Sequence, residues 1–195
     1  LVVLAIENCI TAFKSGDREL CRDILSGDKV INDMERTIEA RCLSLILKQQ
    51  PIASDLRNVS TALKVVTDLE RIGDQSADIA EILLETDVKC PYKMVEHIPN
   101  MACLARDMVK GSIEAFHEHD LKKAAKIKEL ESQMDGLFED VKVELVQIVN
   151  EDKENIDLVI NFLMIAKYFE RIGDHAVNIC EWIEFNQTGT VDNYR

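Results

Sequence analysis

The sequence predicts an all-α protein made of two tandem three-helix bundles that are related by an internal repeat. Glycine and proline number only seven and three in 195 residues, while residues that favour helices, such as Glu, Lys, Leu and Ala, are abundant. Residues 68–81 recur one hundred positions later as 168–181 with seven identities, including an unchanged Glu-Arg-Ile-Gly-Asp. A repeat of this length indicates one structural unit used twice. Residues 1–88 are therefore expected to form the first repeat and 89–195 the second.

Helix-start and helix-stop residues divide the first half into helices. Asp17 and Asp28 are expected N-caps, because a carboxylate accepts hydrogen bonds from the free N–H groups of a first helical turn. The Ser26-Gly27 pair is expected to separate the two helices that these caps begin, and Pro51 to end the second. The front of the first helix is expected to be missing. The helices expected in this half are residues 1–14, 17–25, 28–48 and 54–86.

The second half repeats this order after a linker expected over residues 87–99, which contains Pro91 and Pro99. A cap at Asp120 begins the middle helix, and the last helix begins at Asp152 or Asn155. The helices expected here are residues 100–118, 120–150 and about 155–186, followed by a loose tail of nine residues. Three helices per half with short connections give an up-down-up arrangement.

Composition and motifs argue against several classes of protein. The net charge of −13 disfavours a nucleic-acid binder, because the phosphate backbone would repel such a surface. No apolar run reaches the roughly 18–20 residues of a membrane span, and the six cysteines, none in a C-x-x-C pair, are expected to be buried reduced thiols. A cytoplasmic protein without membrane insertion is predicted. No Gly-rich phosphate loop, nucleophile elbow or Cys-His pair supports catalysis, so no enzyme is predicted.

The repeated segments carry rows of carboxylates at helical spacing. Glu70, Asp74 and Asp78 follow one another at four-residue steps and so form one row along a helix. Like charges at this spacing cost only about 0.2–0.5 kcal/mol per pair, so a solvated charged face is the plain interpretation. Two features favour a binding site instead. The pentapeptide is repeated without change, and Gly73 and Gly173 stand in mid-helix, where glycine costs about 1 kcal/mol and suggests that another backbone or a bulky object comes close.

A second row on the preceding helix strengthens the prediction of a site. Glu35 and Glu39 precede the first copy, and Asp135 and Glu139 precede the second at the same offset. Carboxylates gathered between helices would repel unless they are protonated or bridged by cations, and oxygen-rich sites suit hard cations, iron or manganese. A carboxylate-bridged multinuclear metal cluster is therefore a hypothesis for each half. The Glu-x-x-His motif of ferritin-like di-iron bundles is absent, which counts against an oxygen-activating site.

The four histidines are not expected to be ligands. Three of them, His97, His117 and His119, lie near predicted loops and are expected to be solvated. His175 points about 100° away from the carboxylate row, so we expect it at the surface or behind the ligands.

Three segments together resemble the PhoU family, whose members regulate phosphate transport. They are the duplicated Glu-Arg-Ile-Gly-Asp, residues 50–57 before its first copy, and residues 178–181 after its second copy. The resemblance extends from about Glu7 to Phe185 and implies the PhoU-like fold of two three-helix bundles. It also implies metal clusters on paired acidic motifs, with iron expected and zinc, manganese or magnesium as alternatives. The implied ligands are Glu35, Glu39, Glu70 and Asp74 in the first half, Asp135, Glu139, Glu170 and Asp174 in the second, and Asp78 and Asn178 as adjuncts.

The resemblance further implies a negative regulator of phosphate uptake rather than an enzyme. Such a protein would be an adaptor between the ATPase subunit of a phosphate ABC transporter and a sensor histidine kinase, and a homodimer is expected. The motifs depart from the family pattern at Glu39 and Glu139, which replace the usual aspartate, and where Asp78 becomes Asn178. Two other functions stay open: a metal-storage or redox bundle that uses the same carboxylates, and a plain helical scaffold.

Overall fold

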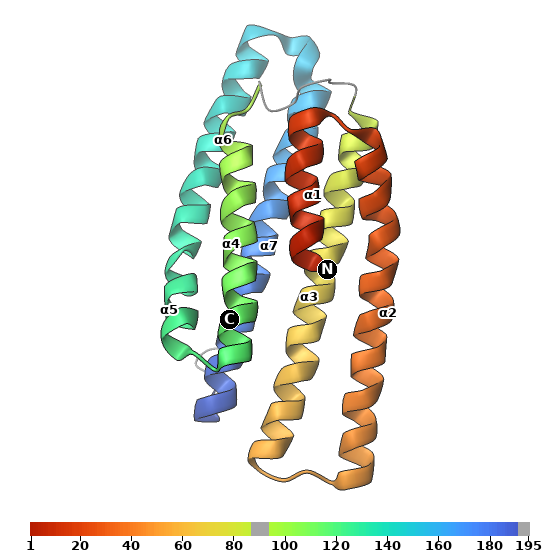
Figure 1. Cartoon of the computed structure of the whole chain (residues 1–195). Coiled ribbons are helices and arrows are strands. Elements are labelled where there is room, and N and C mark those ends of the chain that lie inside the picture. The colour runs from red at the N-terminus through yellow and green to blue at the C-terminus, as the bar shows by residue number, and fades with distance from the viewer. Residues whose placement is uncertain (87–93, 191–195) are drawn as a thin grey trace.

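The computed structural model describes residues 1–86 and 94–190, and all the regular structure in these residues is helical. Figure 1 shows the long helices running up and down the molecule, as the sequence predicts. The helices are α1 (Val2–Ser15), α2 (Arg18–Gln49), α3 (Ser54–Glu85), α4 (His97–Glu118), α5 (Leu121–Glu129), α6 (Glu131–Glu151), a 3-10 turn η2 (Lys153–Asn155) and α7 (Ile156–Thr188). The predicted fold class is confirmed.

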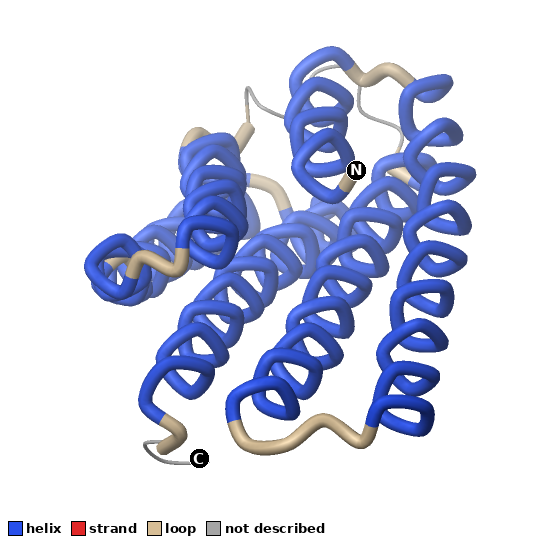
Figure 2. Tube along the Cα trace, turned by 60° about the horizontal axis from the view of Figure 1, so that its bottom comes forward, coloured by secondary structure: helices blue, strands red, loops and turns tan. Residues whose placement is uncertain are grey.

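Two groups of helices pack on each other along their longest members. In the first half α3 contacts α1 and α2, and in the second half α7 contacts α4, α5 and α6. The halves meet where α3 lies against α7 and where α1 lies against α4. Figure 2 shows α2, α3 and α7 side by side in one layer, with α1 on one side of it. One continuous apolar core runs through both halves, so neither half buries its apolar face alone.

The predicted break near Ser26-Gly27 is wrong, because α2 continues through it. Asp17 is the N-cap, as predicted, and its carboxylate accepts hydrogen bonds from the N–H groups of Glu19 and Leu20. The continuation follows from packing: Cys21, Ile24 and Ile31 are the buried residues of α2, and the helix must run unbroken to keep them on one stripe. Burial of that stripe outweighs the roughly 1 kcal/mol that glycine costs inside a helix.

The middle helix of the second half is broken where the sequence predicts continuity. Asp120 caps α5 as predicted, but α5 ends at Glu129 and α6 begins at Glu131. At the joint, the N–H of Leu130 bonds to the carbonyl of Ile127, the tighter spacing of a 3-10 turn. No glycine or proline marks the joint, so helix-stop residues could not predict it.

The second half begins earlier than the predicted linker allows. Residues 87–93 of that linker lie outside the described residues, and α4 begins at His97. Pro99 falls in its first turn, where a missing N–H costs no helical hydrogen bond. The carboxylate of Glu144 in α6 lies 2.8 Å from Nδ1 of His97 and accepts hydrogen bonds from the N–H groups of Glu96 and His97. His97 is thus paired and partly exposed rather than simply solvated, whereas His117 and His119 are exposed as predicted.

The ends of the first and last helices agree with the predicted ones to within two residues. Gly16 ends α1 with a positive φ of 69°, and α7 runs to Thr188, two residues into the predicted tail. Residues 191–195 of that tail lie outside the described residues. Among the described cysteines, Cys9, Cys21 and Cys180 are buried and Cys42 and Cys103 half-buried, all as free thiols.

Gly73 lets α2 approach α3 closely, and this can be tested by adding a methyl group. A Cβ at Gly73 would lie 3.0 Å from Cδ1 of Ile31, whereas a Cβ at Gly27 in α2 would meet nothing within 4 Å. We therefore expect Gly27→Ala to raise the free energy of unfolding by up to about 1 kcal/mol, the usual helix-propensity gain. Gly73→Ala should gain nothing or lose stability. Urea denaturation of both variants measures this, and equal stabilisation by the two would contradict the close packing.

Candidate functional site

In the first half, carboxylates from α2 and α3 gather beside Gly73. Arg71 reaches two of them on α3: its Nε lies 3.5 Å from Oε2 of Glu70 and its Nη1 3.2 Å from Oδ2 of Asp74. Burial raises the pKa of Glu70, and the charge of Asp74 raises it further. Glu35 on α2, which is half-buried, adds to that rise, so α2 and α3 both contribute to one electrostatic cluster, as the sequence predicts.

Asp28 belongs to this cluster and was missed by the sequence analysis, which placed it at a helix start. Its Oδ2 accepts a hydrogen bond of 3.0 Å from the Asn32 amide, while its Oδ1 is buried without a hydrogen-bond partner. That oxygen lies 3.4 Å from the position of a Cβ on Gly73, so the missing side chain leaves room for it. Burial and the charge of Asp74 raise the pKa of Asp28. Its spacing of two helical turns before Glu35 was the signal that could have identified it.

The other two predicted residues of the first half are Glu39 and Asp78, and the charge of Asp78 also raises the pKa of Asp28. Glu39 is exposed on α2. Asp78 faces the other half: burial raises the pKa of Tyr168, and the charge of Asp78 and its hydrogen bond with the tyrosine add to that rise. The structure thus brings together Asp28, Glu35, Glu70 and Asp74. We call these four residues the first cluster.

The second half places its equivalent residues differently. Burial and the charge of Glu170 raise the pKa of Asp174, although the residue is exposed, so solvent limits that rise. The charge of Glu131 in α6 adds to that rise, and Glu131, Asp135 and Glu139 are all exposed. We call Glu131, Glu170 and Asp174 the second cluster. Its Glu170 forms an ion pair with Lys167.

Neither cluster is closed around a cation. Within residues 1–86 and 94–190, no three His, Cys, Asp or Glu side chains come together as a group that could hold a metal ion. The carboxylates would have to turn toward a bound cation to coordinate it. The ten predicted metal ligands therefore stay a prediction.

The seam between α3 and α7 holds residues that the sequence analysis placed elsewhere. Asp68 is buried, and its Oδ1 lies 2.8 Å from Nδ1 of His175 and accepts a hydrogen bond of 3.2 Å from the Asn178 amide. His175 is therefore half-buried at an interface. The pair Asp68–Asn178 has its repeat-related counterpart in Asp78 and Tyr168, so the two contacts are related by the internal symmetry.

This seam explains where the repeat diverges. If the two halves were identical, the contact between positions 68 and 178 would contain the same two residues as the contact between positions 168 and 78. With aspartate at all four positions, two carboxylates would meet in each contact. The chain instead pairs each of Asp68 and Asp78 with an uncharged hydrogen-bond donor, Asn178 and Tyr168. The differences at these positions follow from the packing of the halves.

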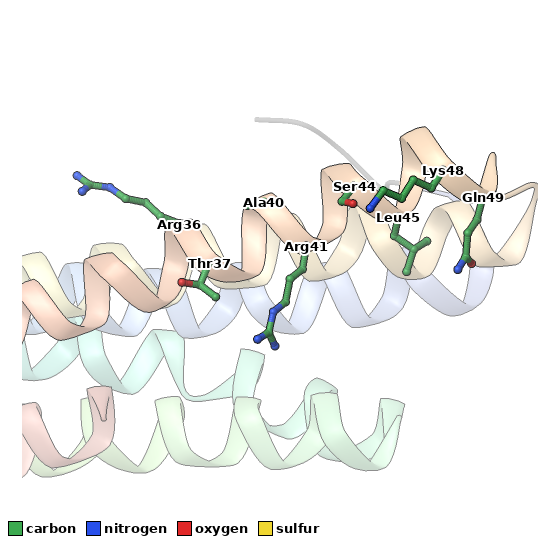
Figure 3. Close-up of a pocket in the computed structure, with 8 residues that line it drawn as sticks. All are labelled: Arg36, Thr37, Ala40, Arg41, Ser44, Leu45, Lys48 and Gln49. Carbon is green, nitrogen blue, oxygen red and sulfur yellow. The ribbon is translucent and has the colours of Figure 1, made fainter.

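One open groove lies on the outer face of α2 and contains none of the predicted ligands. Figure 3 shows its lining residues projecting from this single helix. The groove has a volume of about 650 Å³. Its residues are Arg36, Thr37, Ala40, Arg41, Ser44, Leu45, Lys48 and Gln49. Since α2 alone lines it, the described part of the chain encloses no ligand there.

Fold and site together define a class of protein: tandem three-helix bundles with one Glu-Arg-Ile-Gly-Asp motif in each half, facing the preceding helix. The family model described as the PhoU domain matches residues 1–83 and 98–183. The chain therefore belongs to the PhoU family.

Relatives and solved structures agree with this assignment. The chain is 37% identical to a phosphate-specific transport system accessory protein PhoU homolog of Clostridium acetobutylicum, covering 94% of this chain and 84% of the relative. It is 32% identical to the accessory protein PhoU of Escherichia coli, covering 97% and 78%. The crystal structure of PhoU from Pseudomonas aeruginosa superposes with a TM-score of 0.87 at 32% identity, covering 97% of this chain and 91% of that one. The phosphate transport system regulatory protein PhoU of Streptococcus pneumoniae gives 0.89 at 29% identity, covering 99% and 91%.

In the described part of the chain, no helix combines the length and the apolar composition that a membrane span requires.

Proposed function

We propose that this protein is a cytoplasmic negative regulator of phosphate uptake and of the phosphate-starvation response. In this role it is an adaptor between the ATPase subunit of the phosphate ABC transporter and a sensor histidine kinase, and it catalyses no reaction. The observation that carries the proposal is the match of both halves to the PhoU domain, together with relatives named as phosphate-specific transport accessory proteins.

Exposed apolar side chains at the two helix-hairpin ends support an adaptor. Grooves between helices and apolar helix faces are common binding sites for partner helices, and clustered exposed apolar residues mark interaction surfaces. The same surfaces suit the homodimer that we also propose. The exposed residues are Leu43, Leu47, Ile52 and Leu56 at the α2–α3 end, and Val143, Val146, Ile156, Ile160 and Met164 along α6 and α7.

A binding measurement tests the adaptor role. The purified protein is immobilised, and the transporter ATPase subunit and the cytoplasmic part of the kinase are passed over it separately, with an unrelated ABC ATPase as the control. The proposal predicts retention of both specific partners and not of the control. Failure to retain either partner, with correctly folded protein, contradicts the adaptor role.

The metal part of the proposal rests on the first cluster. Its fit to a cation is supported by the buried, unpartnered Oδ1 of Asp28, by the space that Gly73 leaves beside it, and by an all-oxygen donor set. Asp28, Glu35, Glu70 and Asp74 would hold the metal, for which iron is expected. A bound cation would offset the repulsion among these carboxylates and tie α2 to α3.

Removing two ligands from α3 tests that part. We expect Glu70→Ala combined with Asp74→Ala to abolish metal binding by the first half, because a site without half of its carboxylates loses both charge and coordination. Elemental analysis after iron loading measures it. The matched control is Asp55→Ala with Glu85→Ala, two exposed carboxylates of the same helix. Unchanged metal content in the Glu70/Asp74 variant would contradict the assignment.

The alternative of a metal-storage or redox bundle uses the same carboxylates. It predicts that the protein oxidises ferrous iron in air, which an absorbance measurement would detect. The adaptor proposal predicts no turnover in that measurement.

A further inference from the structure

The two long helix hairpins end at opposite ends of the molecule. Figure 1 shows the α2–α3 connection at one end and the α6–α7 connection at the other. Hydrogen bonds across the seam show the same antiparallel course of α3 and α7. Asn186 near the end of α7 donates to Asn58 near the start of α3 at 2.9 Å, and Asn161 near the start of α7 donates to Thr86 after α3 at 3.3 Å. We call residues 40–64 the α2–α3 end and the repeat-related residues 140–164 the α6–α7 end.

Both ends expose large apolar side chains to water. At the α2–α3 end, Leu47 is 79% exposed and Ile52 78%. At the α6–α7 end, Val146 is 61% exposed, and Ile156 and Ile160 stand four residues apart on α7, so they are neighbours on the helix surface. Grouped exposed apolar side chains of this kind mark a surface that another molecule covers.

The two ends carry opposite net charge, although the repeat makes them equivalent in position. The α2–α3 end has four basic side chains and one acidic one, a net charge of +3, in a chain whose total is −13. Figure 3 shows two of the basic side chains, Arg41 and Lys48, projecting from α2. The α6–α7 end has six acidic and two basic side chains, a net charge of −4. Four of its carboxylates are exposed around the turn between the helices: Glu151, Asp152, Glu154 and Asp157.

From the charges and the exposed apolar groups, we propose that each end binds the opposite end of a second copy of this chain. Apolar side chains then meet apolar side chains, and a net positive surface meets a net negative one. Contact between two like ends is disfavoured, because their net charges repel each other. This inference rests on the homodimer of the proposed function and names the surfaces that form it.

One two-fold axis satisfies both ends of both copies. In a two-fold dimer, every pair of residues that meets in one contact meets again with the copies exchanged. The α2–α3 end of each copy therefore covers the α6–α7 end of the other. Because neither end is left free to bind a third copy, assembly stops at two chains.

Charge reversal tests this pairing, with light scattering during size-exclusion chromatography of the full chain as the readout. The acidic variant combines Arg41→Glu with Lys48→Glu and makes the α2–α3 end net negative. The basic variant combines Glu151→Lys, Glu154→Lys and Asp157→Lys and makes the α6–α7 end net positive. All five side chains are exposed, and circular dichroism verifies that each variant is folded. Each variant alone should dimerise at least about tenfold more weakly than the wild type, because its two ends then have charge of the same sign.

An equal mixture of the two variants should restore the dimer. The acidic α2–α3 end of one variant then meets the basic α6–α7 end of the other, and the remaining two ends are unchanged. Both variants keep a net negative total charge, so attraction between whole molecules does not explain a restored dimer.

A leucine pair tests the apolar part of the contact. Leu47→Ala removes an exposed apolar side chain from the α2–α3 end and should also weaken the dimer. The matched control is Leu4→Ala in α1, which is 56% exposed and lies outside both ends, and it should leave the dimer unchanged.

The outcomes separate this pairing from the proposed function. A wild-type dimer that both charge variants form equally well, or that the mixture fails to restore, overturns the pairing of opposite ends and leaves the homodimer standing. Assemblies larger than a dimer overturn closure by a two-fold axis. A wild type that is monomeric at the highest concentration measured overturns the homodimer and the pairing together. The adaptor role is tested separately by partner retention.

Discussion

Phe162→Ala is expected to lower the free energy of unfolding by about 3–5 kcal/mol, the usual cost of emptying a buried phenylalanine site. Phe162 in α7 is completely buried, and its ring meets that of Phe13 in α1 edge-on, with centroids 5.9 Å apart. The two rings come from different halves. The cavity therefore weakens the contact between the bundles as well as the second bundle itself.

Urea denaturation monitored by circular dichroism measures this loss. Ile160→Ala, one half-turn away on an exposed side of the same helix, is the control and should cost less than about 1 kcal/mol. Separate unfolding steps for the two halves, with Phe162→Ala affecting only the second, would contradict a core shared by both. A loss as small as that of the control would contradict the burial.

Asp68→Ala is expected to cost about 1–3 kcal/mol, because it leaves polar groups at the α3–α7 seam without their acceptor. Asp68 is 9% exposed and joins His175 and Asn178 across the halves. The loss comes chiefly from the unpaired partners rather than from lost apolar contact. It should be measured by chemical denaturation at neutral pH.

Two comparisons isolate this seam. Asp68→Asn keeps an acceptor oxygen and should retain part of the stability that Asp68→Ala loses. The combination of Asp68→Ala with His175→Ala should cost less than the sum of the single changes, since contacting residues are coupled. Strict additivity would contradict a direct interaction between the two side chains.

Much of the fold could be predicted because its signals are local. The caps Asp17 and Asp120 lie at the predicted helix starts, and Gly73 of the repeated pentapeptide lies where α3 packs closely on α2, as its mid-helix position suggests. The errors arise where packing between residues far apart in the sequence determines whether a helix continues or breaks. Gly27 is accommodated because α2 keeps one buried stripe, and the joint at Leu130 carries no breaking residue.

The site was predicted in part for the same reason. Glu70 and Asp74 are spaced on one helix, so periodicity alone aligns them, and the offset of Glu35 places it on the facing helix. Asp28 was missed because a cap and a mid-helix aspartate look alike in sequence. The role of His175 depends on Asp68, which lies 107 residues away in the chain, and no local pattern carries that information.

The regulator account is tested most directly by deleting the gene in its host and measuring alkaline phosphatase in phosphate-rich medium. The account predicts high alkaline phosphatase activity despite plentiful phosphate, because the starvation response is no longer repressed. Restoring the intact gene should return the activity to its low level. Low activity in the deletion strain, unchanged from the parent, would contradict a negative regulator of the phosphate-starvation response.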